Sequence, residues 1–393
     1  MTELMQRYDW RRLEQAAASP VRINNSASLA EYCQQWLKQP LIALDTEFMR
    51  TETFYPIPGL IQVADEQHCY LIDPLQVEDM SPLVELLRAP EVLKVLHAGN
   101  EDIELFRHSY GVIPAPLYDT QIGAAFIGWG FSMGLQRMVA HALDVELGKG
   151  ETTSDWLQRP LTPEQEHYAA LDVAYLPVLA LMQREQLEAR GRLSWVMDEC
   201  EEIGRSITAA DEADPERYYQ RFSQVWQLDQ VRIALLRDLS AWRERTCRQK
   251  DISRNRLLRN EVLLTIAERM PKNEQQLDSI IRRGRILREY GQELLSMIAA
   301  APESARTRPP APIDRPLHYV WNKRLKQLRA IGRKAAEEHD LLPEILLRKR
   351  DLDALIRTRD EEGHYHLPPS LAGWRKPLVG DALLKRIEQF ETS

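Results

Sequence analysis

The stretch LIALDTEFMR, Leu41 to Arg50, places two acidic side chains directly after an apolar run. Four consecutive apolar residues before polar ones are typical of a short strand buried on both faces of a sheet. Because side chains alternate along a strand, Asp45 and Glu47 are expected to point to the same side. Two adjacent carboxylates there repel each other and lose hydration. Exposure at a strand end, arginine partners or a bound cation would each offset that cost, and the stretch alone leaves all three open.

Candidate strands and helices continue from this stretch through residues 21 to about 200. The expected strands are 21–24, 41–47, 60–65, 69–73 and 92–98, and the expected helices include 29–38, 81–88 and 100–109. Strands that first cluster and then alternate with helices predict an α/β domain with a mixed sheet. From about residue 100 to 208 helices are expected to dominate. Beyond residue 211 the strand pattern stops, which predicts all-α helical bundles.

The chain is expected to divide into five segments. They are an N-terminal extension (1–20), the α/β domain (21–210), a first helical domain (211–300), a Pro-rich linker (301–316) and a second helical domain (317–393). The linker, APESARTRPPAPIDRP, has the composition of a semi-rigid spacer. When the sequence is shifted by 89 positions, residues 231–295 give 13 identities, including two glycine pairs. This match predicts that the two helical domains are a tandem repeat.

The composition is that of an ordinary globular protein, with 44% hydrophobic and 28% charged residues among 393. The charge is unevenly distributed. Residues 1–210 contain 16 Lys and Arg against 31 Asp and Glu, a balance of −15, and residues 211–393 contain 35 against 28, a balance of +7, giving −8 for the whole chain. An acidic first half suits a cation site, and a modestly basic second half suits a polyanionic partner.

Export and membrane signals are not expected from this sequence. The N-terminus, MTELMQRYDWRRLEQ, is polar and lacks the apolar core of a signal peptide. No run approaches the roughly 18 apolar residues of a transmembrane helix. Cys33, Cys69, Cys200 and Cys247 are scattered, without zinc-like spacing. We therefore expect a cytoplasmic protein with reduced thiols and no membrane partner.

Two further acidic motifs follow the first. Asp102 in HAGNEDIELF (97–106) falls in the first turn of a helix that follows a strand. In YAALDVAYL (168–176), Tyr168 and Asp172 are four residues apart and share one face of an apolar helix. Converging carboxylates would suit Mg²⁺ or Mn²⁺, and two such ions could bind a phosphodiester. Spacing alone does not establish convergence, so separate structural carboxylates stay open as an alternative.

The order DTE, HAGNED, YAALD resembles the three motifs of the DEDD superfamily of 3′–5′ exonucleases, and its third motif matches the tyrosine-bearing (DEDDy) subgroup. The longer stretches LDTEFMRTETFYPIPGLIQVAD, LHAGNEDIELF and SDWLQRPLTPEQEHYAALDVAYL resemble the ribonuclease D family. The helical repeats resemble HRDC domains, which are nucleic-acid-binding modules. The resemblance covers about residues 21–390. It implies a ribonuclease H-like exonuclease domain followed by two HRDC-type helical bundles.

The resemblance also implies a chemistry and the residues that perform it. It implies a metal-dependent 3′–5′ exoribonuclease with a two-metal-ion mechanism, using Mg²⁺ or Mn²⁺. Asp45, Glu47 and Asp172 would hold the ion that activates the attacking water, Asp45 and Asp102 would hold the second, and Tyr168 would position the water. The implied substrates are RNAs with free 3′ ends, notably transfer RNA precursors and small structured RNAs. The implied products are nucleoside 5′-monophosphates.

Two features depart from the family pattern. The N-terminal extension of about 20 residues precedes the first expected strand, and the sequence assigns it no role. Thr153 stands where relatives often carry a basic residue just before SDW. If that basic residue contacts phosphate, the substrate end would bind more weakly to this chain.

Three further side chains are candidates for substrate binding, and each has a structural alternative. His97 could contact a phosphate or be a hydrogen-bonded structural residue at a strand end. Gln62 could face the cleft or be satisfied within the sheet. Trp156 could stack on a terminal base, although we favour a place in the core.

Arg254, Arg256 and Arg259 form a basic cluster in the first helical domain. Such side chains supply phosphate binding that is independent of base sequence, although a solvated charged face looks the same. With a nuclease domain attached, we expect RNA contact. The loop GWGFSMG (128–134) has no phosphate-loop lysine, so no nucleotide cofactor is expected. A monomer is the default expectation.

Two rival functions stay open. A 3′–5′ DNA exonuclease for repair would carry the same motifs, and discrimination between ribose and deoxyribose depends on 2′-hydroxyl contacts that one sequence does not reveal. The lack of a polymerase domain and of a Walker A motif weakens this alternative. A non-catalytic RNA-binding scaffold would be favoured by loss of a carboxylate, but all four carboxylates and Tyr168 are present.

Overall fold

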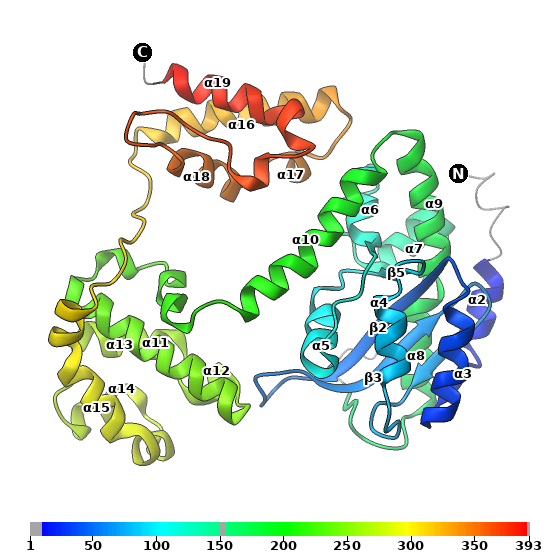
Figure 1. Ribbon diagram of the computed structural model, residues 1–393, viewed down its shortest axis with the longest axis horizontal. Helices are drawn as coiled ribbons and strands as arrows, with labels where there is room; N and C mark the ends of the chain where they lie inside the picture. The colour runs from blue at the N-terminus through cyan, green and yellow to red at the C-terminus, as the bar shows by residue number, and fades with distance from the viewer. Residues whose placement is uncertain (1–9, 149–153, 391–393) are drawn as a thin grey trace. The chain divides into compact units, whose positions relative to one another are not determined.

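The computed structural model describes residues 10–148 and 154–390 of the chain (Figure 1). Thr153, the position that departs from the family pattern, lies outside these residues. The chain divides into two compact units. The first unit comprises residues 1–48, 58–207 and 317–393, and the second comprises residues 49–57 and 208–316.

A mixed sheet lies at the centre of the first unit, which confirms the predicted fold class. Among the described residues its six strands are β1 (Val21–Ile23), β2 (Leu41–Met49), β3 (Ile57–Ala64), β4 (Cys69–Ile72), β5 (Leu93–Leu96) and β6 (Leu117–Asp119), in the order β1-β4-β3-β2-β5-β6. Strands β1 and β4, β2 and β5, and β5 and β6 pair in parallel, whereas β3 and β4 pair antiparallel. Strand β2 is therefore an interior strand, as its apolar start predicts.

Helices flank the sheet and continue into the C-terminal part of the first unit. They are α2 (Trp10–Ala17), α3 (Ser26–Trp36), α4 (Ser81–Arg88), α5 (Asn100–Tyr110), α6 (Thr120–Phe126), α7 (Leu135–Leu143), α8 (Pro163–Ala174), α9 (Leu176–Ala189), α10 (Leu193–Asp211), α16 (Trp321–Glu338), α17 (Pro343–Leu346), α18 (Lys349–Arg357) and α19 (Asp381–Gln389), with short turns at Pro369–Leu371 and Lys376–Gly380. Helix α8 packs against β4, and α9 packs against β5. Helix α9 is buried almost continuously from Leu176 to Gln183, whereas α8 buries one face, formed by Gln165, Ala169, Ala170, Val173 and Ala174.

Helix α2 gives the N-terminal extension a structural place that the sequence did not assign. It packs against α8 and β4, and its Leu13 and Ala17 are fully buried in the core of the first unit. The Nδ1 atom of His167 on α8 lies 3.2 Å from the carbonyl oxygen of Ala17. Helix α2 therefore covers the helix that carries the third motif.

The C-terminal helices of the first unit dock on α10. The indole ring of Trp374 stacks on that of Trp195, with ring centres 5.1 Å apart, and meets Phe126 edge-on. Beside this stack, Arg375 donates hydrogen bonds to both carboxylate oxygens of Glu199 on α10. Arg192 donates to the backbone carbonyls of Phe126 and Asp340, which joins the same two parts of the unit. Stacking of this kind adds about 0.5–1.5 kcal/mol to the burial of the rings.

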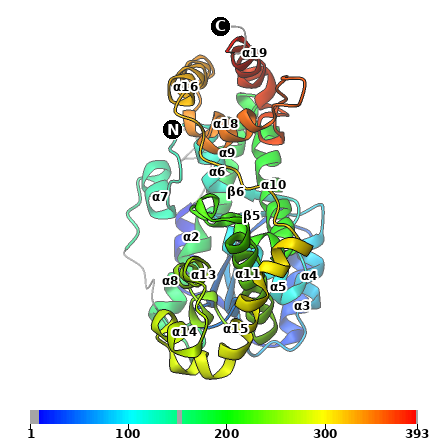
Figure 2. The ribbon, with the colours of Figure 1, turned by 90° about the vertical axis from the view of Figure 1, so that its left-hand side faces the viewer.

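The second unit consists of helices, the irregular chain that connects and follows them, and one inserted segment. Its helices are α11 (Gln230–Lys250), α12 (Arg254–Leu257), α13 (Asn260–Arg269), α14 (Glu274–Ile281) and α15 (Gly284–Thr307), with 3₁₀ turns at Pro215–Arg221 and Val225–Gln227, and Figure 2 shows α11, α13, α14 and α15 together. The inserted segment, residues 49–57, contributes Phe54 to the core, where its side chain is 8% exposed. The amides of Phe54 and Tyr55 both donate to the Asp251 carboxylate, at 3.0 Å each.

The segment 301–316 contains both helix and extended chain. Helix α15 continues through Pro302 to Thr307, and residues 309–318 have no regular structure. None of the helices in residues 10–148 and 154–390 is both long and apolar enough to cross a membrane.

Candidate active site

Strand β2 presents the carboxylates of the first motif. Residues 41–44 are no more than 1% exposed, so the burial of this run sets the register of the strand. Asp45 and Glu47 follow on one side of the strand and are only partly buried. The sequence therefore places two acidic groups at the point where an interior strand emerges from the core.

Helix α8 presents the third motif. Thr162 and Gln165 form a capping box at its start, in which the Thr162 hydroxyl accepts from the Gln165 amide and the Gln165 side chain accepts from the Thr162 amide. Such a cap fixes the residue at which a helix begins and hence the face that each later residue occupies. Tyr168 and Asp172 lie one turn apart on this helix and are hydrogen-bonded to each other.

The two elements bring three carboxylates together. Asp45, Glu47 and Asp172 each offer an oxygen atom, and these atoms all lie within 4.8 Å of one another. In the described part of the chain, no lysine or arginine forms an ion pair with this group or is among the main causes of its pKa shifts. Hard, anionic oxygen donors in such a cluster fit Mg²⁺ or Mn²⁺.

Asp102, from the first turn of α5, joins the group through Thr46. The Thr46 hydroxyl donates a hydrogen bond to Asp102 Oδ1, and the Thr46 backbone also hydrogen-bonds to this carboxylate. Asp102 is 8% exposed, and its charge acts on Asp45 more strongly than those of Asp172 and Glu47 do. The structure therefore places all four carboxylates of the motifs in one electrostatic cluster.

The pKa values of all four carboxylates in the cluster are raised. Burial, followed by the charge of Asp102, raises the pKa of Asp45 well above its ordinary value. Burial and the charges of Asp172 and Asp102 raise the pKa of Glu47 to about 8. Burial is also the main reason that the pKa values of Asp102 and Asp172 are raised to about 6. A divalent cation would remove this repulsion and restore the ionised forms.

Tyr168 keeps its phenolic proton across the neutral pH range. Burial, followed by the charges of Asp172 and Glu47, raises the pKa of its hydroxyl above the ordinary value. Its ring lies 6.3 Å from that of Trp156 between centres. The hydroxyl is thus a fixed neutral group at the edge of the carboxylate cluster.

Two residues that support the motifs were missed by the sequence reasoning. Asp119 accepts hydrogen bonds from the amides of Ala98 and Gly99, at 3.1 and 3.0 Å, and also caps α6. It therefore shapes the loop that leads to Asp102, where Ala98 has a left-handed φ of 56°. An aspartate between a strand and a helix start is a capping signal that could have identified it.

Arg159 is the second such residue, and it anchors the segment before α8. It donates to both carboxylate oxygens of Asp73, at 2.6 and 2.8 Å, and to the carbonyls of Gly59 and Trp156. Burial would raise the pKa of Asp73, but the hydrogen bonds and charge of Arg159 lower it overall. No sequence pattern links these residues, because Asp73 is 86 positions away.

His97, Gln62 and Trp156 lie close to the core. The Nδ1 atom of His97 is 2.9 Å from the Thr120 hydroxyl, and burial lowers the pKa of its ring. Gln62 is fully buried on β3, and neither amide atom of its side chain has a partner among the described residues. Trp156 is 4% exposed and packs against Gly59, where a Cβ atom would come within 2.7 Å of its carbonyl oxygen.

The predicted basic cluster lies in the second unit, at α12 and the start of α13. Arg254 forms two 2.7 Å hydrogen bonds with the buried Glu244 carboxylate, and Arg256 forms an ion pair with Glu52. Arg259 is exposed at the N-terminal end of α13. The cluster thus combines one arginine held by a buried acid with two at the surface.

Comparison with known proteins places two family models on the chain. Residues 20–187 match the 3′–5′ exonuclease family, and residues 232–298 match the HRDC domain. The ribonuclease D of Pseudomonas paraeruginosa is 42% identical over 367 residues, which cover 93% of this chain and 97% of that protein. The ribonuclease D of Escherichia coli is 36% identical over 374 residues, covering 94% and 98%.

A solved structure extends the comparison to three dimensions. The crystal structure of Escherichia coli RNase D, described as an exoribonuclease involved in structured RNA processing, superposes with a TM-score of 0.88 at 35% identity. The match covers 95% of this chain and 99% of that one.

Proposed function

Because this chain belongs to the ribonuclease D family and is a 3′–5′ exoribonuclease, we propose that Asp45, Glu47, Asp102 and Asp172 bind two divalent metal ions, Mg²⁺ or Mn²⁺. The observation that carries this proposal is the convergence of three carboxylate oxygens within 4.8 Å, without a cationic partner in the described residues. When bound, the ions would supply Lewis acidity, which eases deprotonation of the attacking water and offsets charge on the leaving oxygen.

The positions of the carboxylates suggest how they share this task. Asp45, Glu47 and Asp172 form the compact group and would hold the ion on the side of the attacking water. Asp45 and Asp102 would hold the second ion. Thr46 would keep Asp102 in place through its hydrogen bonds to that carboxylate.

Tyr168 would position the attacking water. Its hydroxyl stays protonated and is hydrogen-bonded to Asp172, so its oxygen lone pairs can accept a hydrogen bond from the water. In-line attack on the last phosphodiester would then add the water oxygen to phosphorus and return a proton to the leaving 3′ oxygen. The products would be a nucleoside 5′-monophosphate and an RNA that is shorter by one nucleotide.

The substrates that we propose are transfer RNA precursors with 3′ trailers and other small structured RNAs with free 3′ ends. Full-length similarity to the Escherichia coli enzyme, whose printed description is structured RNA processing, supports this class. We also propose a cytoplasmic location, because Cys33, Cys69, Cys200 and Cys247 are all free and buried. A monomer is proposed as the default state. Light scattering of the purified chain tests the monomer.

The proposed function is tested with a 5′-labelled RNA that carries a transfer-RNA-like stem and a short 3′ tail. In Mg²⁺ the label should appear in a ladder that shortens from the 3′ end, and thin-layer chromatography should identify nucleoside 5′-monophosphates. Chelator should stop the reaction, and Asp102→Asn should reduce it at least 100-fold, because the variant keeps the acceptor for Thr46 but loses the charge.

Glu101→Gln is the matched control, because Glu101 lies in the same first turn of α5 but is exposed. It should trim RNA at the rate of the unaltered chain. Full activity of Asp102→Asn would overturn the metal assignment. Faster trimming of the matching DNA strand would favour the repair exonuclease, and binding without shortening in Mg²⁺ or Mn²⁺ would favour the scaffold.

A further inference from the structure

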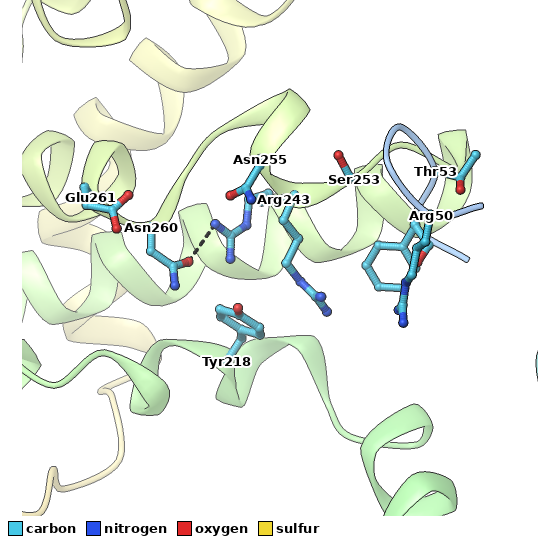
Figure 3. Close-up of a pocket in the computed structure, with 10 residues that line it drawn as sticks. Arg50, Thr53, Tyr218, Arg243, Ser253, Asn255, Asn260 and Glu261 are labelled. Carbon is cyan, nitrogen blue, oxygen red and sulfur yellow. Dashed lines mark hydrogen bonds between the residues drawn. The ribbon is translucent and has the colours of Figure 1, made fainter. Parts of the chain in front are cut away.

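The second unit contains a polar cleft of about 440 Å³ that has no part in the chemistry described above. It is lined by two stretches of the unit, residues 49–57 and the region from Tyr218 through α13, and we call it the arginine cleft. Figure 3 shows Arg50, Arg243, Tyr218 and Asn260 around it. Its size is in the range of pockets that take small ligands, of which one nucleotide is an example.

The arginine cleft carries an excess of positive charge. Arg243, with a fully buried side chain, and Arg254 share one buried carboxylate, that of Glu244. Arg254 uses Nε and Nη2 for this acid, which leaves its Nη1 without a partner in the described part of the unit. Arg50 adds a third guanidinium, and Glu261 is the one acidic residue in the lining. Two arginines on one acid leave a positive charge that an anion would neutralise.

Aromatic rings hold these arginines and offer a stacking surface. The guanidinium groups of Arg243 and Arg254 lie 4.9 and 5.3 Å from the centre of the Tyr218 ring. Arg254 also lies 4.6 Å from the Phe54 ring centre. Arg221 also lies over the Tyr218 ring, 5.2 Å from its centre. Tyr218 is partly exposed, so a base can stack against the layer that the ring forms with these arginine planes, as bases of single-stranded RNA stack on aromatic rings and arginines in proteins.

Amide groups complete the polar lining. Asn260 Oδ1 accepts a 2.8 Å hydrogen bond from Arg243, so the Asn260 side-chain NH₂ is left to donate. Asn255, on α12, is exposed beside it. A cleft with cations, a ring and amides matches the chemistry of a nucleotide, which joins a phosphate, a planar base and polar base edges.

The segment 49–57 is firmly held in this unit and follows the first motif directly. Ser253 donates from its amide to the Glu52 carbonyl at 2.8 Å, and Arg50 Nε donates to the Phe54 carbonyl at 3.2 Å. In the sequence, Arg50 comes three residues after Glu47. In the sequence, the strand that carries two of the proposed metal ligands is therefore followed directly by residues that line the arginine cleft.

We propose that the arginine cleft binds one nucleotide of the single-stranded RNA upstream of the 3′ end. Arg50 and Arg254 Nη1 contact its phosphate, and its base stacks against the layer that Tyr218 forms with the arginine planes. This inference rests on the proposed function, because it names a second binding site for the same RNA. Binding here holds the body of the substrate while its 3′ end is shortened.

The test measures RNA binding by the full chain in chelator, where no RNA is consumed. The probe is a fluorescein-labelled single-stranded 12-nucleotide RNA, read by fluorescence anisotropy. Tyr218→Ala should weaken binding about tenfold through lost stacking, and Tyr218→Phe, which keeps the ring, should restore it to within about twofold. Arg50→Gln should weaken binding and lower the slope of log affinity against log salt by about 0.7, the loss of one phosphate contact.

Arg306→Gln is the matched control, because it removes an exposed arginine of the same unit outside the cleft. Its affinity and salt slope should equal those of the unaltered chain, and circular dichroism should show that every variant is folded. A 5-iodouridine in the RNA should cross-link to Tyr218 on irradiation. The proposal would be overturned if Tyr218→Ala and Arg50→Gln bound the RNA with the same affinity as Arg306→Gln.

The outcome is distinguishable from failure of the proposed function. If the cleft is wrong, the variants bind like the control while RNA is still trimmed in Mg²⁺. If the proposed chemistry is wrong, RNA is not trimmed in Mg²⁺, or Asp102→Asn trims it at an unchanged rate. The cleft variants would still bind RNA more weakly than the control in chelator. A preference of the cleft for the DNA strand over RNA of the same sequence would count against RNA as its occupant.

Discussion

Thr46 donates its hydroxyl to the Asp102 carboxylate, which ties the strand of the first motif to the helix of the second. Thr46 stands between Asp45 and Glu47 and is buried. Its side chain therefore points to one side of β2, and the two carboxylates point to the other. The middle letter of the first motif is thus a positioning residue for the carboxylate from the second motif.

Thr46→Val should separate this hydrogen bond from the shape of the side chain. The variant leaves a buried carboxylate short of a donor, which should cost about 1–3 kcal/mol of stability and raise the pKa of Asp102 further. We expect exonuclease activity to fall about tenfold and the Mg²⁺ concentration for half-maximal rate to rise. Thr46→Ser keeps the hydroxyl and should restore the Mg²⁺ dependence, and an unchanged Mg²⁺ dependence in Thr46→Val would contradict the positioning role.

Asp172→Asn should stabilise the metal-free protein while removing activity. At pH 8 the substitution relieves repulsion in the cluster, so the free energy of unfolding in chelator should increase by about 1–2 kcal/mol. Differential scanning fluorimetry with and without Mg²⁺ measures both effects, because the stabilisation by Mg²⁺ should shrink in the variant. Glu164→Gln, on the same helix but exposed, should leave both readings unchanged. A less stable Asp172→Asn protein in chelator would show that the repulsion is not there.

The stability of the metal-free protein should depend on pH through the same cluster. The pKa values of Asp102 and Asp172 are raised to about 6 and that of Glu47 to about 8. A raised carboxylate pKa means that the folded state favours the protonated form. Its stabilising contribution is therefore complete below about pH 4 and is lost as the pH rises through 6 and then 8. Urea unfolding in chelator should show this loss between pH 5 and 8, Mg²⁺ should reverse it, and a flat profile would count against the raised pKa values.

Arg375→Gln should loosen the C-terminal helices from α10. Burial would raise the pKa of Glu199, but hydrogen bonds and charge from Arg375, together with the charge of Arg348, lower it overall. Breaking this pair removes the bidentate partner of a partly buried acid, which keeps only Arg348, 3.5 Å away, and the Trp374 indole N–H. The expected cost is about 1–3 kcal/mol. We expect earlier thermal unfolding and faster proteolysis after residue 308.

The double variant Glu199→Gln with Arg375→Gln should recover part of the loss, because the acid no longer stands without its closest cation, and Arg348, which loses Glu199, is the more exposed of the two arginines. The lowered pKa of Glu199 means that its stabilisation is present above the ordinary carboxylate range and is lost as the pH falls through it. Arg190→Gln is the control. It breaks the ion pair between Arg190 and Asp340, which is more exposed than the pair between Arg375 and Glu199, and it should cost less than about 1 kcal/mol. Equal losses in the single and double variants would show that the ion pair does not hold the helices.

The sequence predicted the parts of the fold that depend on local pattern. Strand β2 and the face of α8 follow from an apolar run, a cap and a spacing of four residues, and the structure brings Asp45, Glu47 and Asp172 together. Strand β6 lies in the region where we expected helices to dominate, and it has three residues, too few for a periodic pattern to register. The sequence did not predict the amphipathic helix α2, because it lies in a polar N-terminal stretch without a recognisable helix-capping residue.

Other features depend on partners that are distant in the chain. Asp251 binds the amides of Phe54 and Tyr55 almost two hundred positions away, and no motif connects them. Gln62 interrupts an apolar strand, but its burial without a partner among the described residues is visible only once the sheet is formed. Arg243 and Glu244 are adjacent charged residues with no distinguishing motif, and only the structure shows that both are buried.

The insertion of residues 49–57 into the second unit also bears on how this helical module can be exchanged between proteins. A fragment cut at residues 208 and 316 would lack Phe54 and keep an open apolar site, together with an Asp251 carboxylate that has lost two amide donors. A transplant of the module would therefore have to bring residues 49–57 of the nuclease sequence with it. The helical unit and the turn after β2 are accordingly expected to coevolve, so that residues 49–57 are gained, lost or altered together with the unit.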